Sequence, residues 1–157
     1  MMLVARRSAL AAALVLSAVL ANSRRATACE CVGVPATTHL RGADVVYTGR
    51  VVDIRTDSRR FAWPEIEFQL ERTIKGRTDG KRVLLVTPAV GGPNCRGFDF
   101  ATGKKYLVFA TTRDSETGWP GTYGVSWCGG TVLLESDEGK QRLRETLQLS
   151  RRSMERP

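Results

Sequence analysis

The sequence predicts a single, mainly β domain, built as a small closed barrel of five strands and followed by a C-terminal helix. Three observations indicate this architecture. Short valine-rich or alternating segments recur along the chain, turn residues separate them, and the last regular stretch changes to helical spacing. The length of 157 residues suits one domain, and the 42% of hydrophobic and 25% of charged residues are typical of a globular protein.

Five segments have the composition of strands. Residues 43–55 are rich in valine, and Gly49 within them predicts a bulge or a sharp bend. Residues 64–76 alternate between apolar and polar side chains, so one face of that strand is expected in the core and the other in solvent. The remaining predicted strands are residues 81–87, 106–110 and 121–127.

A helix is predicted over residues 138–152. Leu143 and Leu147 are four residues apart, acidic residues stand at its start, and basic residues stand at its end. Five strands, a bend in the first strand and a terminal helix together favour a barrel of the OB type. The sequence contains neither an internal repeat nor a linker that would separate a second domain.

The first 28 residues have the features of a secretion signal. Two arginines precede an apolar run over residues 9–21. This run is too short for a membrane span of about 20 residues but fits the core of a signal peptide. Small residues at 26–28 supply the site that a signal peptidase reads, so we expect cleavage after Ala28 and a mature domain at residues 29–157. The mature protein is therefore expected to be secreted and extracellular.

Two other forms of processing remain open. Cleavage after Ala21 would leave Asn22 at the front, and lipoprotein processing would acylate Cys29 and anchor the protein to a lipid surface.

The leader also accounts for much of the net positive charge of the chain. It holds four arginines and no acid, so about half of the formal net charge of +8 leaves with it. We therefore expect no nucleic-acid partner, no membrane association after the leader is removed, and a monomer.

All four cysteines lie in the expected mature part: Cys29, Cys31, Cys95 and Cys128. An even count behind a secretion signal predicts two disulfides. Four cysteines allow three pairings. A bridge between Cys29 and Cys31 would be strained, and both other pairings tie the N-terminus to two distant points in the chain.

The sequence shows no catalytic constellation. The only histidine, His39, stands alone in a stretch that reads as a polar loop, and its expected role is surface or loop packing. Glu65, Glu67 and Glu71 are expected to form a solvated strand face rather than a catalytic carboxylate pair. No Ser-His-Asp grouping, phosphate-binding loop or zinc-protease helix appears. We therefore expect a protein that is not an enzyme and that needs no cofactor.

Several motifs carry a resemblance to a known family. They are Cys29-Glu30-Cys31 at the expected mature N-terminus, Ala43-Asp44-Val45-Val46, Ile74-Lys75-Gly76, Cys95-Arg96-Gly97, Gly103-Lys104-Lys105-Tyr106-Leu107, and Cys128. The mature chain resembles, over nearly its whole length, the N-terminal inhibitory domain of the tissue inhibitors of metalloproteinases, a netrin-like domain. The resemblance implies disulfides between Cys29 and Cys95 and between Cys31 and Cys128.

The resemblance also implies a function, the inhibition of a zinc metalloprotease. The free amine and the carbonyl oxygen of Cys29 would chelate the catalytic zinc of the target and displace its water. Glu30 would enter the specificity pocket beside the zinc, at a position where the family tends to carry a small Ser or Thr. The other residues expected to contact the target are Cys31, Val32, Pro93, Asn94 and Cys95.

A second hypothesis needs no protease. A secreted netrin-like module could bind another protein or an anionic polysaccharide through basic side chains. The arginines that would form this basic surface are Arg41, Arg50, Arg55, Arg59 and Arg60.

Overall fold

A computed structural model describes the chain over residues 31, 33–56, 63–78, 80–87, 97–113 and 122–154. Within these residues the protein is mainly β, with six strands and two helices. In chain order the elements are α2 (Ala36–Gly42), β1 (Val45–Arg55), β2 (Glu65–Lys75), β3 (Arg82–Val86), β4 (Lys105–Arg113), β5 (Thr122–Gly124), β6 (Val132–Leu133) and α3 (Asp137–Met154).

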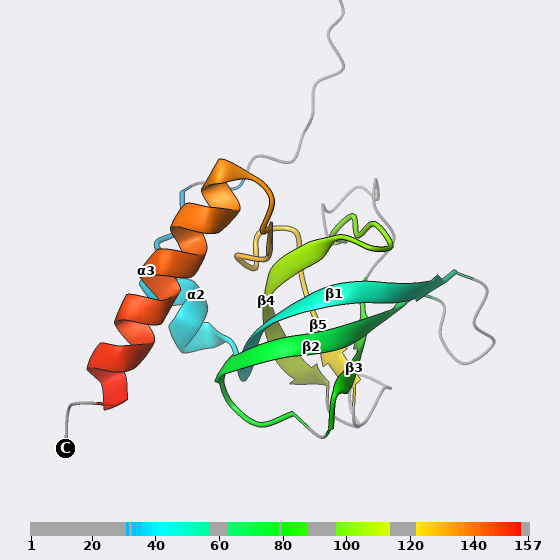
Figure 1. Cartoon of the computed structure of the whole chain (residues 1–157), viewed down its shortest axis with the longest axis horizontal. Helices are drawn as coiled ribbons and strands as arrows, with labels where there is room; N and C mark the ends of the chain where they lie inside the picture. Colours follow the sequence, from blue (N-terminus) through cyan, green and yellow to red (C-terminus); the bar gives the residue numbers. More distant parts are fainter. Residues whose placement is uncertain are drawn as a thin grey trace, which may run out of the picture. The chain divides into compact units, whose positions relative to one another are not determined.

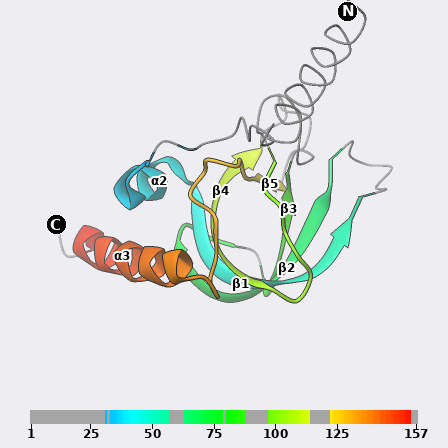
Figure 2. The ribbon, with the colours of Figure 1, turned by 90° about the horizontal axis from the view of Figure 1, so that it is seen from above.

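Five of the strands close into a barrel. Their order is β1-β2-β3-β5-β4, and pairing between β1 and β4 closes the ring, while β6 lies outside it on β4. β3 and β5 are parallel, and the other pairs are antiparallel. Figure 2 shows the strands around the barrel interior, with α2 and α3 side by side on one flank. The predicted mainly β barrel with a C-terminal helix is confirmed, and the strand order is compatible with an OB-type barrel.

The barrel interior is filled by aromatic and aliphatic side chains. Phe68 is fully buried, and its ring meets those of Tyr47, Phe100 and Tyr106 edge to face, at centroid distances of 5.6, 5.3 and 6.3 Å. Such edge-to-face pairs contribute about 0.5–1.5 kcal/mol each beyond the area they bury. The alternation predicted for residues 64–76 places Phe68 on the inner face, as the sequence indicated.

The first half of β1, residues 45–49, is buried on both faces, which explains the apolar residues at 45–47. Val45 and Tyr47 belong to the barrel core, whereas Val46 packs in a second cluster beneath the helices. The bulge predicted at Gly49 is present as a register shift against β2 between Thr48 and Gly49. A Cβ at Gly49 would lie only 2.9 Å from a backbone oxygen of β2, so the close approach of the two strands requires glycine there.

The helix α2 was not predicted, because its sequence contains consecutive threonines and a terminal glycine, which are weak helix formers. Tertiary contacts stabilise it instead. The amine of Lys75, at the end of β2, donates hydrogen bonds to the carbonyl oxygens of Leu40, Arg41 and Ala43. A cation at the carboxyl end of a helix binds the carbonyls that have no partner within the helix.

The predicted C-terminal helix is confirmed, with α3 slightly longer at each end than expected. Ser136 caps it: the Ser136 hydroxyl accepts a hydrogen bond from the Gly139 N–H at 3.0 Å. Asp137 and Glu138 occupy the first turn, where negative charge is favourable. No helix in the described part has the length and apolarity that crossing a membrane requires. Figure 1 shows α3 passing alongside α2, against the barrel.

Candidate functional site

A disulfide joins the N-terminal segment to the barrel. Cys31, which precedes α2, is bonded to Cys128, which follows β5, with 5.4 Å between their Cα atoms. The bridge closes a sequence separation of 97 residues, so it connects the two ends of the barrel sequence. This is the pairing that the family resemblance implies for these two cysteines. It fixes the chain within two residues of Cys29.

The sheet brings a second segment to the same place. The parallel pairing of Val86 with Gly124 makes the chain leave β3 and β5 at the same edge. After β3, the backbone N–H of Phe98 donates a hydrogen bond to the hydroxyl of Thr87, which links the two ends of residues 88–97. The ring of Phe98 then packs against that of Trp127, with centroids 6.2 Å apart. We call the surface formed by Cys31, Phe98, Trp127 and Cys128 the bridged edge.

Among the described residues, Trp127 is the most exposed large hydrophobic residue, with 37% of its surface accessible to solvent. It stands beside the disulfide and borders a surface groove of about 430 Å³. The groove is lined on one side by Cys31, Phe98 and Cys128, and on the other by residues of α2 and α3. An exposed aromatic next to a concave surface is a common feature of interaction sites.

His39 lies in α2, not in a loop, and it is half-buried at the wall of this groove. Its ring lies 5.8 Å from that of Phe109. Gly130, which has a φ of +89°, lies close to the His39 ring: a Cβ built on Gly130 would be 2.5 Å from the Cγ of His39. Burial lowers the pKa of His39, and the nearby charge of Arg142 lowers it further, against a hydrogen bond with the backbone of Val34 that raises it. His39 thus connects the N-terminal segment to the rest of the fold.

Arg142 forms the α3 wall of the same groove. Its Nη2 donates to the Glu138 carboxylate at 3.2 Å, whereas its buried Nη1 has no hydrogen-bond partner among the described residues. A buried donor without a partner is unusual and costs about 1–3 kcal/mol. Neither Arg142 nor Trp127 was singled out for a site from the sequence, because their proximity to Cys31 depends on the closure of the barrel.

Most of the predicted target-contacting residues lie outside the described part of the chain: Cys29, Glu30, Val32, Pro93, Asn94 and Cys95. Cys31 is described and lies at the bridged edge. The predicted disulfide between Cys29 and Cys95 also lies outside the described residues.

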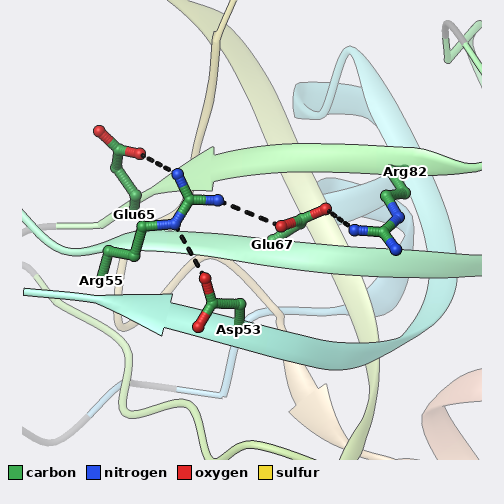
Figure 3. A network of polar contacts seen from close by, with 5 residues as sticks. All are labelled: Asp53, Arg55, Glu65, Glu67 and Arg82. Carbon is green, nitrogen blue, oxygen red and sulfur yellow. Dashed lines mark hydrogen bonds and ion pairs between the residues drawn. The ribbon is translucent and has the colours of Figure 1, made fainter.

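The acidic residues of β2 do not form the solvated row that was expected. Glu65 is buried, with 6% of its side chain exposed, and Figure 3 shows it in a network around Arg55. The Arg55 guanidinium lies 2.8 Å from the Asp53 carboxylate, 3.2 Å from Glu67 and 3.7 Å from Glu65, while Arg82 pairs with the other oxygen of Glu67. The bond from Arg55 holds the pKa of Asp53 below its usual value. The prediction of a solvated face was wrong at Glu65, whose burial this cation compensates, whereas Glu71 is exposed.

The same network bears on the second hypothesis. Three carboxylates surround Arg55 and compensate its charge. Arg50 donates to the backbone oxygen of Gly103, which orients its side chain and leaves its positive charge available. Arg59 and Arg60 lie outside the described residues. No group of three or more His, Cys, Asp or Glu side chains that could hold a metal ion occurs in the described ranges.

Neither a protein-family model nor a curated protein matches this sequence.

Proposed function

We propose that the exported protein inhibits a zinc metalloprotease and that the α-amine and carbonyl oxygen of Cys29 bind the zinc of its target. The observation that carries the proposal is the Cys31–Cys128 bridge at an edge with an exposed tryptophan. A disulfide two residues from the chain end limits the freedom of that end. A bound inhibitor then loses less conformational entropy, which favours affinity.

The chemistry requires only backbone atoms of this chain. An amine and a carbonyl of one residue form a five-membered ring with the metal and occupy the position of the water that the protease must activate. The pKa of an α-amine is about 8, so its neutral form is available near physiological pH. The proposal requires cleavage after Ala28, because any residue before Cys29 converts the amine into an amide.

Two further segments support the proposal. Phe98, which packs against Trp127 at the bridged edge, follows the 93–95 segment by three residues in the sequence. We infer that Pro93, Asn94 and Cys95 flank the N-terminal segment in the complex. Cys31 and Val32 would continue along the cleft of the protease.

Glu30 sets the choice of target. A carboxylate that enters an apolar pocket costs several kcal/mol unless a partner meets it. We therefore infer a target whose pocket beside the zinc carries a cation or hydrogen-bond donors. Replacing Glu30 with Thr is expected to widen inhibition to proteases with apolar pockets.

The experiment compares two forms of the protein against a panel of zinc proteases. One form begins at Cys29 and the other carries a single additional alanine before it, and intact mass before and after reduction establishes the start and the disulfides of each. We expect inhibition by the first form and a loss of about 100-fold or more in the second, because the amine no longer binds metal.

Two results would contradict the proposal. Equal inhibition by both forms would exclude the Cys29 chelate. If neither form inhibits any protease, and Glu30→Thr does not restore inhibition, the protein is not an inhibitor of this kind.

A further inference from the structure

A second groove lies between α2 and α3, at the end of β2, with a volume of about 720 Å³. Leu40, Ile74 and Leu149 contribute its apolar side chains, and all three are only partly buried. Leu40 and Ile74 also pack on the apolar cluster between the barrel and the helices. We call this surface the helix groove. It is large enough to take a few side chains of a partner.

The helix groove is basic. Arg41 and Arg152 line it, and both are exposed. Within the described residues neither guanidinium forms an ion pair with a carboxylate, in contrast to Arg55 and Arg82. No Asp or Glu of the described chain lines the groove. The nearest carboxylates are Asp44, which acts on Lys75, and Glu145, which lines the adjoining surface with Arg152.

Lys75 adds a third positive charge, with a different role. Its amine is held by the carbonyl oxygens of Leu40, Arg41 and Ala43, so it stabilises α2 and fixes one end of the groove. The two arginines therefore remain as the groups that can meet a partner. Exposed cations beside partly exposed aliphatic side chains favour a ligand that is both acidic and apolar.

We propose that the helix groove docks an acidic segment of a partner protein, with one or more apolar side chains of that segment against Leu40, Ile74 and Leu149. A sulfated polysaccharide would meet the arginines but would gain nothing from the aliphatic residues. A flat membrane surface would not fill a concave groove between two helices. A peptide segment matches both the charge and the shape.

The helix groove is distinct from the bridged edge. Arg142 lines the groove at the bridged edge and Arg152 lines the helix groove, and the two residues are about 15 Å apart along α3. The two sites can therefore be occupied at the same time, and this inference does not depend on the proposed inhibition of a protease.

The test uses a short fluorescent peptide of alternating leucine and glutamate, with binding to the purified protein followed by anisotropy. We expect saturable binding that weakens as salt is added, and a Kd about tenfold higher for the double variant Arg41→Gln/Arg152→Gln. Arg144→Gln is the matched control, because Arg144 is exposed on the same helix but lines neither groove.

Two further arms separate charge from apolar contact. A peptide of alternating serine and glutamate is expected to bind more weakly than the leucine peptide. The variant Leu149→Asn is expected to bind the two peptides with nearly the same affinity, because it loses the apolar contact that favours the leucine peptide. Circular dichroism of each variant establishes that the fold is retained.

Four outcomes would overturn the proposal. They are failure of the leucine–glutamate peptide to bind, equal binding of a leucine–lysine peptide, unchanged affinity in the double variant, and equal losses in the double variant and in Arg144→Gln. Tighter binding to vesicles with anionic lipid, or to heparin, that is lost in the same double variant would assign the groove to that ligand instead.

Discussion

The barrel interior and the bridged edge are stabilised in different ways. In the interior, Phe68 is fully buried among other aromatic rings. At the edge, Trp127 is 37% exposed, and the N-terminal segment is joined to it through one covalent bridge and a histidine. Packing alone determines the position of the interior. The position of the edge depends on the bridge and on the packing of Phe98 against Phe100 and Tyr106 of the core.

The largest expected effect is on the interior. Phe68→Ala removes the ring at the centre of the aromatic cluster and leaves a cavity that neighbouring strands cannot fill. We expect the free energy of unfolding to fall by about 3–5 kcal/mol. Urea denaturation followed by circular dichroism measures this change.

The matched control is Gln69→Ala, the adjacent residue on the same strand, which is exposed. It is expected to change stability by no more than about 0.5 kcal/mol. Similar losses in both variants would mean that the strand itself, rather than the aromatic cluster, is sensitive to substitution.

The next effect concerns the bridge. Replacing both Cys31 and Cys128 with Ser removes a cross-link over 97 residues, and we expect a loss of about 2–5 kcal/mol of stability. Amide exchange is expected to accelerate most in residues 33–42, because these lose their covalent link to the barrel. The proposed inhibition of a zinc metalloprotease should fall with the loss of the bridge.

Ser126→Ala, an exposed change close to the bridge, serves as the control and is expected to have little effect. If the double Ser variant kept both the stability and the exchange pattern of the native protein, the bridge would not determine the position of the edge.

The barrel could be predicted from the sequence because its signals are local. Alternation in β2, valines in β1 and the glycine bulge each follow from a few adjacent residues. Two elements were missed for an equally physical reason. The helix α2 depends on Lys75, which is more than 30 positions away in the chain, and β6 is only two residues long and pairs with the outer side of β4.

The site was less predictable. Cysteine spacing and the resemblance pointed to Cys31 and Cys128, but nothing local indicated that Phe98, Trp127 and Arg142 would meet beside them. Their meeting depends on the parallel pairing of β3 and β5, which joins segments far apart in sequence. The burial of Glu65 and its ion pair with Arg55 were also missed. The alternation of residues along one strand does not reveal which cation lies opposite on the neighbouring strand.

The smallest effect is a pH dependence confined to the bridged edge. Histidine in an unfolded chain has a pKa of about 6.5. Burial and the charge of Arg142 lower the pKa of His39 in the fold. The folded state therefore favours the neutral imidazole. The stability that this preference contributes is present above pH 6.5 and is lost as the pH falls through the folded pKa. The charged groups that face His39 are Arg142 and its partner Glu138, both on α3.

We expect the native protein to lose more stability than His39→Gln between about pH 7.5 and about pH 5. Amide exchange around Val34 and Gly130 should accelerate over the same range, while the residues around Phe68 remain protected. If the two proteins lost equal stability, His39 would not couple the edge to pH. If exchange instead accelerated equally in the barrel, the edge and the interior would unfold as one unit, and the distinction between them would fail.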